Sequence, residues 1–83
     1  MEKFQEIIQS DKPVVVDFYA DWCGPCKAMA PVIKEVAAET EGRARIIKVD
    51  VDRNPDAAAK YDVRAIPTFI IFKNGQPVWR HAG

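Results

Sequence analysis

This 83-residue chain is poor in cysteine and has no excess of either charge, and each shortage excludes a class of protein. Its two cysteines are too few for the four protein ligands of a closed zinc site or for a disulfide-rich secreted scaffold. Its 12 basic residues balance 12 acidic ones, so no overall positive charge favours nucleic acid. No apolar run approaches the roughly 20 residues that span a bilayer. We therefore expect neither nucleic acid nor a membrane as a partner.

The N-terminus also lacks the pattern of a secretory signal peptide. The first residues, MEKFQE, have neither a basic start nor an apolar centre. We therefore expect a cytoplasmic protein, in which a close pair of cysteines is more often catalytic than structural. The length suits one small domain, which we predict to span residues 1–83.

Hydrophobic periodicity predicts helices alternating with strands. We expect helices over residues 1–9, 26–41 and 54–61, and strands over residues 14–19, 44–51, 68–73 and 78–81. The first two strands flank a helix, which implies parallel pairing through a right-handed crossover. Asn74-Gly75 predicts a hairpin between the last two strands. Pro31 predicts a kink in the second helix, and Gly42 is expected to end that helix. The pattern indicates an α/β fold with a mixed four-stranded sheet and flanking helices.

Both cysteines lie in one short segment, Trp22-Cys23-Gly24-Pro25-Cys26, between a predicted strand and a predicted helix. A helix N-terminus carries partial positive charge and unpaired N–H groups, which stabilise a thiolate. We therefore expect Cys23, on the exposed side of the turn, to attack a substrate disulfide. Cys26, about one helical turn inward, would resolve the mixed disulfide. Gly24 would permit a tight turn, and Pro25 would make it rigid.

Two other interpretations of the cysteine pair compete with a redox role. A structural disulfide across so short a loop would constrain the unfolded chain very little. A zinc site needs four ligands, whereas the chain offers two cysteines and a distant His81. A zinc or iron–sulfur site shared by two copies of the chain is a further alternative. We expect no metal and no other cofactor, because the cysteines themselves carry the electrons.

Four stretches of the sequence resemble thioredoxins, and the likeness covers nearly the whole chain. They are residues 15–27 (VVDFYADWCGPCK), 48–55 (KVDVDRNP), 61–68 (YDVRAIPT) and 72–75 (FKNG). The resemblance implies a thioredoxin-like three-layer fold. It implies a thiol–disulfide oxidoreductase that reduces protein disulfides and is recycled by a thioredoxin-reductase-like electron donor. The residues between the cysteines favour the reducing type over oxidase and isomerase relatives. A catalytically idle binding or scaffold module is the alternative function.

Asp17 interrupts an otherwise apolar strand. Burial disfavours the charged form of a carboxyl, so we expect a raised pKa for Asp17 unless its side chain reaches solvent at the strand end. The resemblance implies that Asp17 lies beneath the cysteines and acts as general base for Cys26 through water. It also implies that Lys48 lies near Asp17 and tunes it. A lysine at that position could also pack its stem while its amine reaches water.

The resemblance further assigns residues that contact substrate. Ile66-Pro67 matches the cis-proline loop of the family, which packs opposite the cysteines and holds substrate in an extended pose. Trp22 would either shape the contact surface or fill the core. Trp79 and His81 are expected to be packing or surface residues. The predicted contact set is Trp22, Gly24, Pro25, Ile66, Pro67 and Gly83.

The chain departs from the thioredoxin pattern at both ends, so the predicted fold is a truncated one. It starts at a helix that a further strand usually precedes, and it stops at Gly83, after which a final helix usually follows. In the family that strand borders the strand expected at residues 44–51. We therefore expect an unpaired sheet edge, an exposed sheet face, and either low stability or a dimer through the exposed edge.

Overall fold

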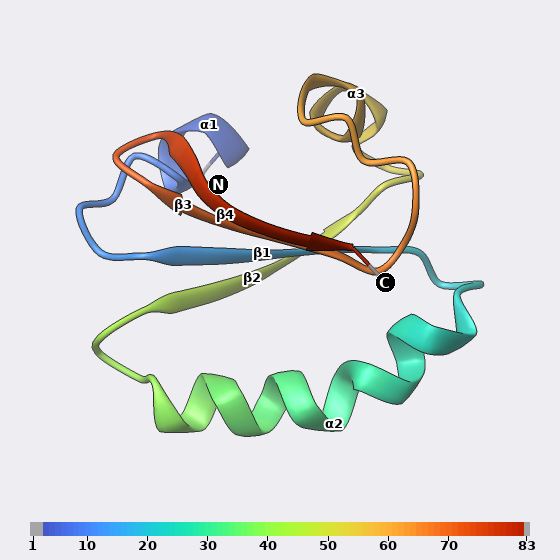
Figure 1. The fold of residues 1–83 in the computed structure, drawn as a ribbon, viewed down its shortest axis with the longest axis horizontal. Coiled ribbons are helices and arrows are strands. Elements are labelled where there is room, and N and C mark those ends of the chain that lie inside the picture. Colours follow the sequence, from blue (N-terminus) through green and yellow to red (C-terminus); the bar gives the residue numbers. More distant parts are fainter. Residues whose placement is uncertain (1–2, 83) are drawn as a thin grey trace.

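A computed structural model describes residues 3–82 as an alternation of helices and strands. In this range the helices are α1 (Phe4–Ile7), α2 (Gly24–Glu39) and α3 (Pro55–Lys60), and the strands are β1 (Val14–Tyr19), β2 (Arg45–Asp50), β3 (Thr68–Lys73) and β4 (Gln76–Ala82). Figure 1 shows α1 and α3 on one face of the sheet and α2 on the other, so the fold has three layers. None of the helices formed by these residues is long and apolar enough to cross a membrane.

The strands form one mixed sheet in the order β2-β1-β3-β4. β1 and β2 pair in parallel, since α2 carries the chain across the sheet between them, while β1–β3 and β3–β4 are antiparallel. The predicted bounds of β1 and β3 are confirmed, whereas β2 is shorter and β4 longer than predicted. The sheet confirms the predicted mixed four-stranded α/β fold, and β2 lies at one of its edges.

α2 begins earlier than predicted because Cys23 caps it. The cap residue has extended backbone, and the helix starts at Gly24 rather than at Cys26. It ends at Glu39, so Gly42, with a φ of +85°, lies in the turn after the helix and does not end it as predicted. Pro31 lies inside the helix, and Figure 1 shows α2 bending along its length, as that proline predicts.

The main core lies between the sheet and the layer of α1 and α3. Alternate residues of β1 point into it, namely Val14, Val16 and Phe18, which are fully buried. Phe72 of β3 meets the rings of Phe4 and Tyr61 at centroid distances of 5.8 and 4.9 Å. The other residues of β1, including Asp17, therefore point to the opposite face of the sheet, toward α2.

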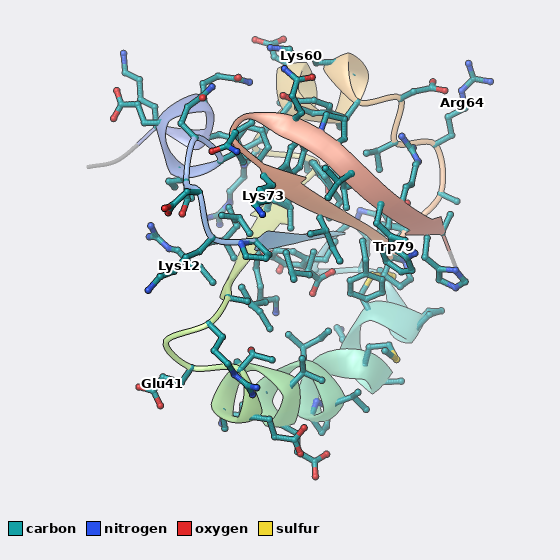
Figure 2. The ribbon with its side chains drawn as sticks, turned by 60° about the vertical axis from the view of Figure 1, so that its left-hand side comes forward. Lys12, Glu41, Lys60, Arg64, Lys73 and Trp79 are labelled. Carbon is teal, nitrogen blue, oxygen red and sulfur yellow. A yellow bond between two sulfur atoms is a disulfide. The ribbon has the colours of Figure 1, made fainter. Side chains whose placement is uncertain are left out.

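The layer on the α2 side is less densely covered. Val32 and Val36 of α2 are 44% and 38% exposed. Trp79 of β4 is 52% exposed and stacks on His81 with ring centroids 5.9 Å apart. Figure 2 shows the ribbon with its side chains and labels Trp79 on the outer strand β4. The exposure of these apolar side chains agrees with the expected exposed face. Trp79 and His81 are surface residues, one of the two alternatives expected for them.

Candidate redox-active site

The two cysteines form a disulfide at the start of α2, with their Cα atoms 5.3 Å apart. β1 ends just before this point, and a turn leads from it into the helix. The Cys23 N–H closes the turn by donating a hydrogen bond of 3.1 Å to the Ala20 carbonyl. Cys23 Sγ accepts a hydrogen bond of 3.1 Å from the backbone N–H of Cys26. Since this N–H belongs to the first turn of α2, the N-terminus of the helix can stabilise a Cys23 thiolate after reduction.

The exposure of the two cysteines differs from the prediction. Cys23 is 3% exposed and Cys26 is 9% exposed, so Cys23 does not lie on the exposed side of the turn in the disulfide form. The physical reason is packing, because Ala20 and the partly buried Tyr19, Val51 and Ile66 surround the pair. The position of Cys23 as the helix cap, rather than exposure, distinguishes the two sulfurs.

Gly24 and Pro25 occupy the first turn of α2 and are both exposed. Gly24 does not have a positive φ, unlike Gly42 and Gly75, and a Cβ atom added to it would meet nothing within 4 Å. The turn at residue 24 therefore does not depend on the conformational freedom that is special to glycine. Pro25 suits the first turn of a helix, where its missing N–H breaks no helical hydrogen bond.

Asp17 is 4% exposed and lies on the α2 side of the sheet. Its Oδ1 atom is buried and has no hydrogen-bond partner among residues 3–82. Burial raises the pKa of the Asp17 carboxyl above its ordinary value, and the positive charge of Lys48 opposes this rise. The predicted rise in pKa is thus confirmed, and the alternative of a carboxyl that reaches solvent is wrong. That Asp17 serves Cys26 as a base stays a prediction.

Lys48 pairs with Asp17 in the β1–β2 register. Its side chain is exposed, and its Nζ atom lies 4.5 Å from the centroid of the Tyr19 ring. The exposure of Lys48 agrees with the alternative in which its amine reaches water, and its charge lowers the pKa of the Asp17 carboxyl. That Lys48 tunes Asp17 in the reaction stays a prediction. A cavity of about 180 Å³ beside this group is lined by Tyr19, Ala20, Asp21, Cys26, Lys27, Ala30 and Lys48.

The peptide bond between Ile66 and Pro67 is cis, which confirms the cis-proline loop. Ile66 packs against the cluster of Ala20, Cys23 and Cys26, so the loop lies beside the disulfide as expected. Pro67 is fully buried and immediately precedes β3. The register of β1 with β3 explains this position, because Thr68, the residue after Pro67, pairs with Phe18 close to the cysteine turn.

Trp22 is 69% exposed, so the alternative in which it fills the core is wrong. Its Nε1 atom donates a hydrogen bond of 2.9 Å to Oδ2 of Asp52, which ties the cysteine turn to the segment after β2. Sequence reasoning missed Asp52 as part of the site. A signal was available, because parallel pairing of β1 and β2 brings together the segments that follow their carboxyl ends. Trp22 lies in the first of these segments and Asp52 in the second. Gly83, the last predicted contact residue, lies outside the described residues.

We predict that Asp52→Ala releases the Trp22 side chain. The hydrogen bond would be lost from an exposed site, so the expected cost in stability is about 1 kcal/mol or less. In a Trp79→Phe background, Trp22 is the only tryptophan, and its fluorescence anisotropy should fall in Asp52→Ala. Asp21→Ala removes an exposed carboxylate next to Trp22 in sequence and serves as the control. Equal anisotropy in the two variants would show that Asp52 does not hold the ring.

Few groups in the site could hold a metal ion. Within residues 3–82, no three His, Cys, Asp or Glu side chains are gathered in the way that metal binding requires. Both cysteine sulfurs are bonded to each other. What the arrangement can do is exchange two electrons and protons with another dithiol or disulfide.

Comparisons with known proteins agree with one another. The family model described as thioredoxin matches residues 1–83. The chain is 53% identical over 74 residues to thioredoxin 1 of Nostoc sp., covering 89% of this chain and 69% of that protein. It is 61% identical over 69 residues to a thioredoxin of Staphylococcus aureus, covering 83% of this chain and 66% of that protein. The chain thus spans about two thirds of the length of these relatives.

The fold also matches a solved structure. Oxidized mitochondrial thioredoxin 3 of Saccharomyces cerevisiae superposes with a TM-score of 0.89 at 40% sequence identity. The match covers 96% of this chain and 74% of the yeast chain. At that level of identity, the likeness extends beyond the fold to the sequence that builds it.

Proposed function

This chain belongs to the thioredoxin family of thiol–disulfide oxidoreductases, and on that premise we propose that it reduces disulfides in other proteins through Cys23 and Cys26. The observation that carries the proposal is the Cys23–Cys26 disulfide at the N-terminus of α2, with the Cys26 N–H donating to Cys23 Sγ. A helix N-terminus favours the thiolate over the thiol at the capping position. Cys23 is therefore the nucleophile of the proposed reaction.

The proposed reaction has two exchanges. In the first, the Cys23 thiolate attacks one sulfur of a substrate disulfide, a mixed disulfide forms, and the other substrate sulfur leaves as a thiolate. In the second, Asp17 accepts the proton of Cys26 through water, and Cys26 Sγ attacks Cys23 Sγ. The mixed disulfide breaks, and the remaining substrate sulfur leaves. The raised pKa of the buried Asp17 carboxyl supports its role as the proton acceptor.

The proposed substrate surface surrounds the disulfide. Trp22, Gly24 and Pro25 are exposed beside it, and Ile66 packs against it, which supports a contact role for each. An extended substrate segment would pair with the backbone before Pro67. Gly83 belongs to the same proposed set. A disulfide-containing protein chain, rather than a small molecule, is the substrate class that such an open surface suits.

The proposal also includes an electron donor, a cellular compartment and an oligomeric state. A thioredoxin-reductase-like protein would return two electrons to the Cys23–Cys26 disulfide. We place the reaction in the cytoplasm, where the redox poise keeps dithiols reduced. A dimer could form along the outer side of β2, which is an edge strand of the sheet that residues 3–82 form. Sedimentation at several concentrations tests that dimer, and an invariant monomer mass would exclude it.

The direct test is the reduction of insulin disulfides with dithiothreitol as the electron source. The chain at catalytic concentration should accelerate precipitation of the insulin B chain above the rate with dithiothreitol alone. The matched control is the same chain reduced and then alkylated with iodoacetamide, which blocks both sulfurs. If the untreated chain is no faster than its alkylated form, the reductase proposal fails, and an idle binding module becomes the better interpretation.

A further inference from the structure

Three side chains of the site share one face of the sheet. Asp17 and Tyr19 are two residues apart on β1, so both point toward the α2 layer. Lys48 lies opposite Asp17 on β2. The Lys48 ammonium is nevertheless 4.5 Å from the centre of the Tyr19 ring, and among residues 3–82 no ion pair joins it to Asp17. The lysine is therefore held over a neutral ring while its charge acts on the carboxyl through space.

Lys48 also lines both a cavity and a neighbouring groove. The cavity of about 180 Å³ beside Cys26 is lined by both Tyr19 and Lys48. A wider groove of about 640 Å³ between α2 and β2 shares Lys27, Ala30 and Lys48 with it. Lys48 is exposed and lines both the cavity and the groove, so its ammonium has open space besides its position over the Tyr19 ring. The ring of Tyr19, which lines the cavity beside Cys26, is in contact with the ammonium.

Other charges near this group come from each neighbouring segment. The turn after β1 contributes Asp21 and α2 contributes Lys27, both at the cavity beside Cys26. On β3 the register partner of Asp17 is Phe69, which has no charge, and His81 of β4 pairs with Phe69. Asp50 lies further along β2 and accepts the backbone N–H of Asp52. Among these charges, that of Lys48 lowers the pKa of the Asp17 carboxyl and so opposes the rise caused by burial.

We propose that Tyr19 is a positioning residue of the redox site, whose ring holds the Lys48 ammonium at the cavity beside Cys26, where its charge acts on Asp17. The catalytic consequence rests on the proposed reductase function, whereas the electrostatic consequence does not. Without the ring, the ammonium moves away from the cavity and into solvent. The Asp17 carboxylate then loses part of its attraction, and the pKa of Asp17 rises further.

The experiment uses a double-mutant cycle in the oxidised protein. The variants are Tyr19→Leu, Tyr19→Phe, Lys48→Met and the double variant Tyr19→Leu/Lys48→Met. Titration of the Asp17 carboxyl carbon by NMR reports its pKa without any need for activity. Tyr19→Leu should raise that pKa toward the value in Lys48→Met, and Tyr19→Phe, which keeps the ring, should leave it near the wild-type value. In the Lys48→Met background, Tyr19→Leu should have no further effect.

Two results would overturn the proposal. The first is a Tyr19→Leu effect that persists without Lys48, because a merely structural role of the tyrosine would act in both backgrounds. The second is an unchanged or lowered pKa of Asp17 in Tyr19→Leu. If Tyr19→Leu does not fold, a measurement on the wild-type protein still tests whether Lys48 contacts the Tyr19 ring. The ε-methylene protons of Lys48 should show an upfield ring-current shift that persists in Tyr19→Phe, and its absence would exclude the contact.

The catalytic arm separates this proposal from the reductase proposal. A higher pKa of Asp17 moves the acidic limb of the pH profile of insulin reduction to higher pH, because the carboxylate is the base. On that limb Tyr19→Leu should be roughly two- to fivefold slower, the population change that an exposed cation–π contact supports. If the wild-type chain does not reduce insulin, the reductase proposal fails while the Asp17 titration still tests the role of Tyr19.

Discussion

Replacing Cys23 with serine should reduce insulin turnover to the rate of dithiothreitol alone, whereas replacing Cys26 with serine should trap the substrate. Serine cannot form the first mixed disulfide, so Cys23→Ser stops the reaction before any covalent complex forms. In Cys26→Ser the first exchange proceeds through Cys23, but no second sulfur is present to release the product. The complex should then accumulate and survive on a non-reducing gel.

The two variants form a matched pair, because each changes one sulfur to oxygen at the N-terminus of α2, Cys23 as its cap and Cys26 in its first turn. The hydrogen bond to Cys23 Sγ is donated by the backbone N–H of residue 26. A serine at this position has the same backbone N–H, so Cys26→Ser keeps the bond. Mass spectrometry of a digest identifies the residue that carries the substrate. Substrate linked to Cys26 in Cys23→Ser, or activity retained in that variant, would reverse the assigned roles.

The second large effect is expected at Asp17, whose replacement by alanine should stabilise the fold while slowing the reaction. The carboxyl is 4% exposed, and its Oδ1 atom is buried with no hydrogen-bond partner among residues 3–82. Removing such a group should raise the free energy of unfolding at neutral pH by about 1–3 kcal/mol. Urea unfolding of the oxidised chain measures this change. Asp11→Ala removes an exposed carboxyl and is the control.

The pH dependence of this stability has a definite sign. The pKa of Asp17 is raised in the folded chain, so the folded state holds a proton that the unfolded state releases. Between the ordinary pKa of an aspartate and the raised one, the wild-type free energy of unfolding therefore falls as pH rises. Asp17→Ala should lack this fall, and the gap between the two proteins should close at acidic pH. A constant gap at all pH values would contradict the raised pKa.

The kinetic effect of Asp17→Ala should fall on the second exchange. If Asp17 takes the proton of Cys26, its loss slows resolution by a factor on the order of 10²–10⁴, the usual contribution of a general base. The mixed disulfide should then accumulate transiently in rapid-quench experiments, while the first exchange keeps its rate. Slowing of the first exchange alone would assign Asp17 to Cys23 instead.

Several features of the site could be predicted from the sequence because they depend on local spacing. The cysteine pair follows an apolar strand and begins a helix, and these relations survive folding unchanged. Asp17 was identified because a carboxyl in an apolar strand is anomalous without any knowledge of its neighbours. The cis bond before Pro67 and the substrate surface came from the resemblance to thioredoxins, since no local pattern specifies either.

Other features depend on contacts between segments far apart in the chain. The hydrogen bond from Trp22 to Asp52 and the contact of Lys48 with Tyr19 both join the β1 region to the β2 region. Both arise from parallel pairing, which aligns Tyr19 with Asp50 and brings the carboxyl ends of the two strands together. Periodicity predicts the pairing but not which side chains meet across it.

The sequence by itself determined the order of the elements, the mixed sheet, the redox pair and the carboxyl behind it, because hydrophobic period and residue spacing are local properties. Only the tertiary structure decided that Cys23 is buried in the disulfide, that Trp22 is exposed and bound to Asp52, and that Gly24 has an ordinary backbone. These properties depend on how the Ile66 loop and the α2 layer pack around the cysteines. Burial and contact are sums over segments distant in sequence, so no single stretch of the chain specifies them.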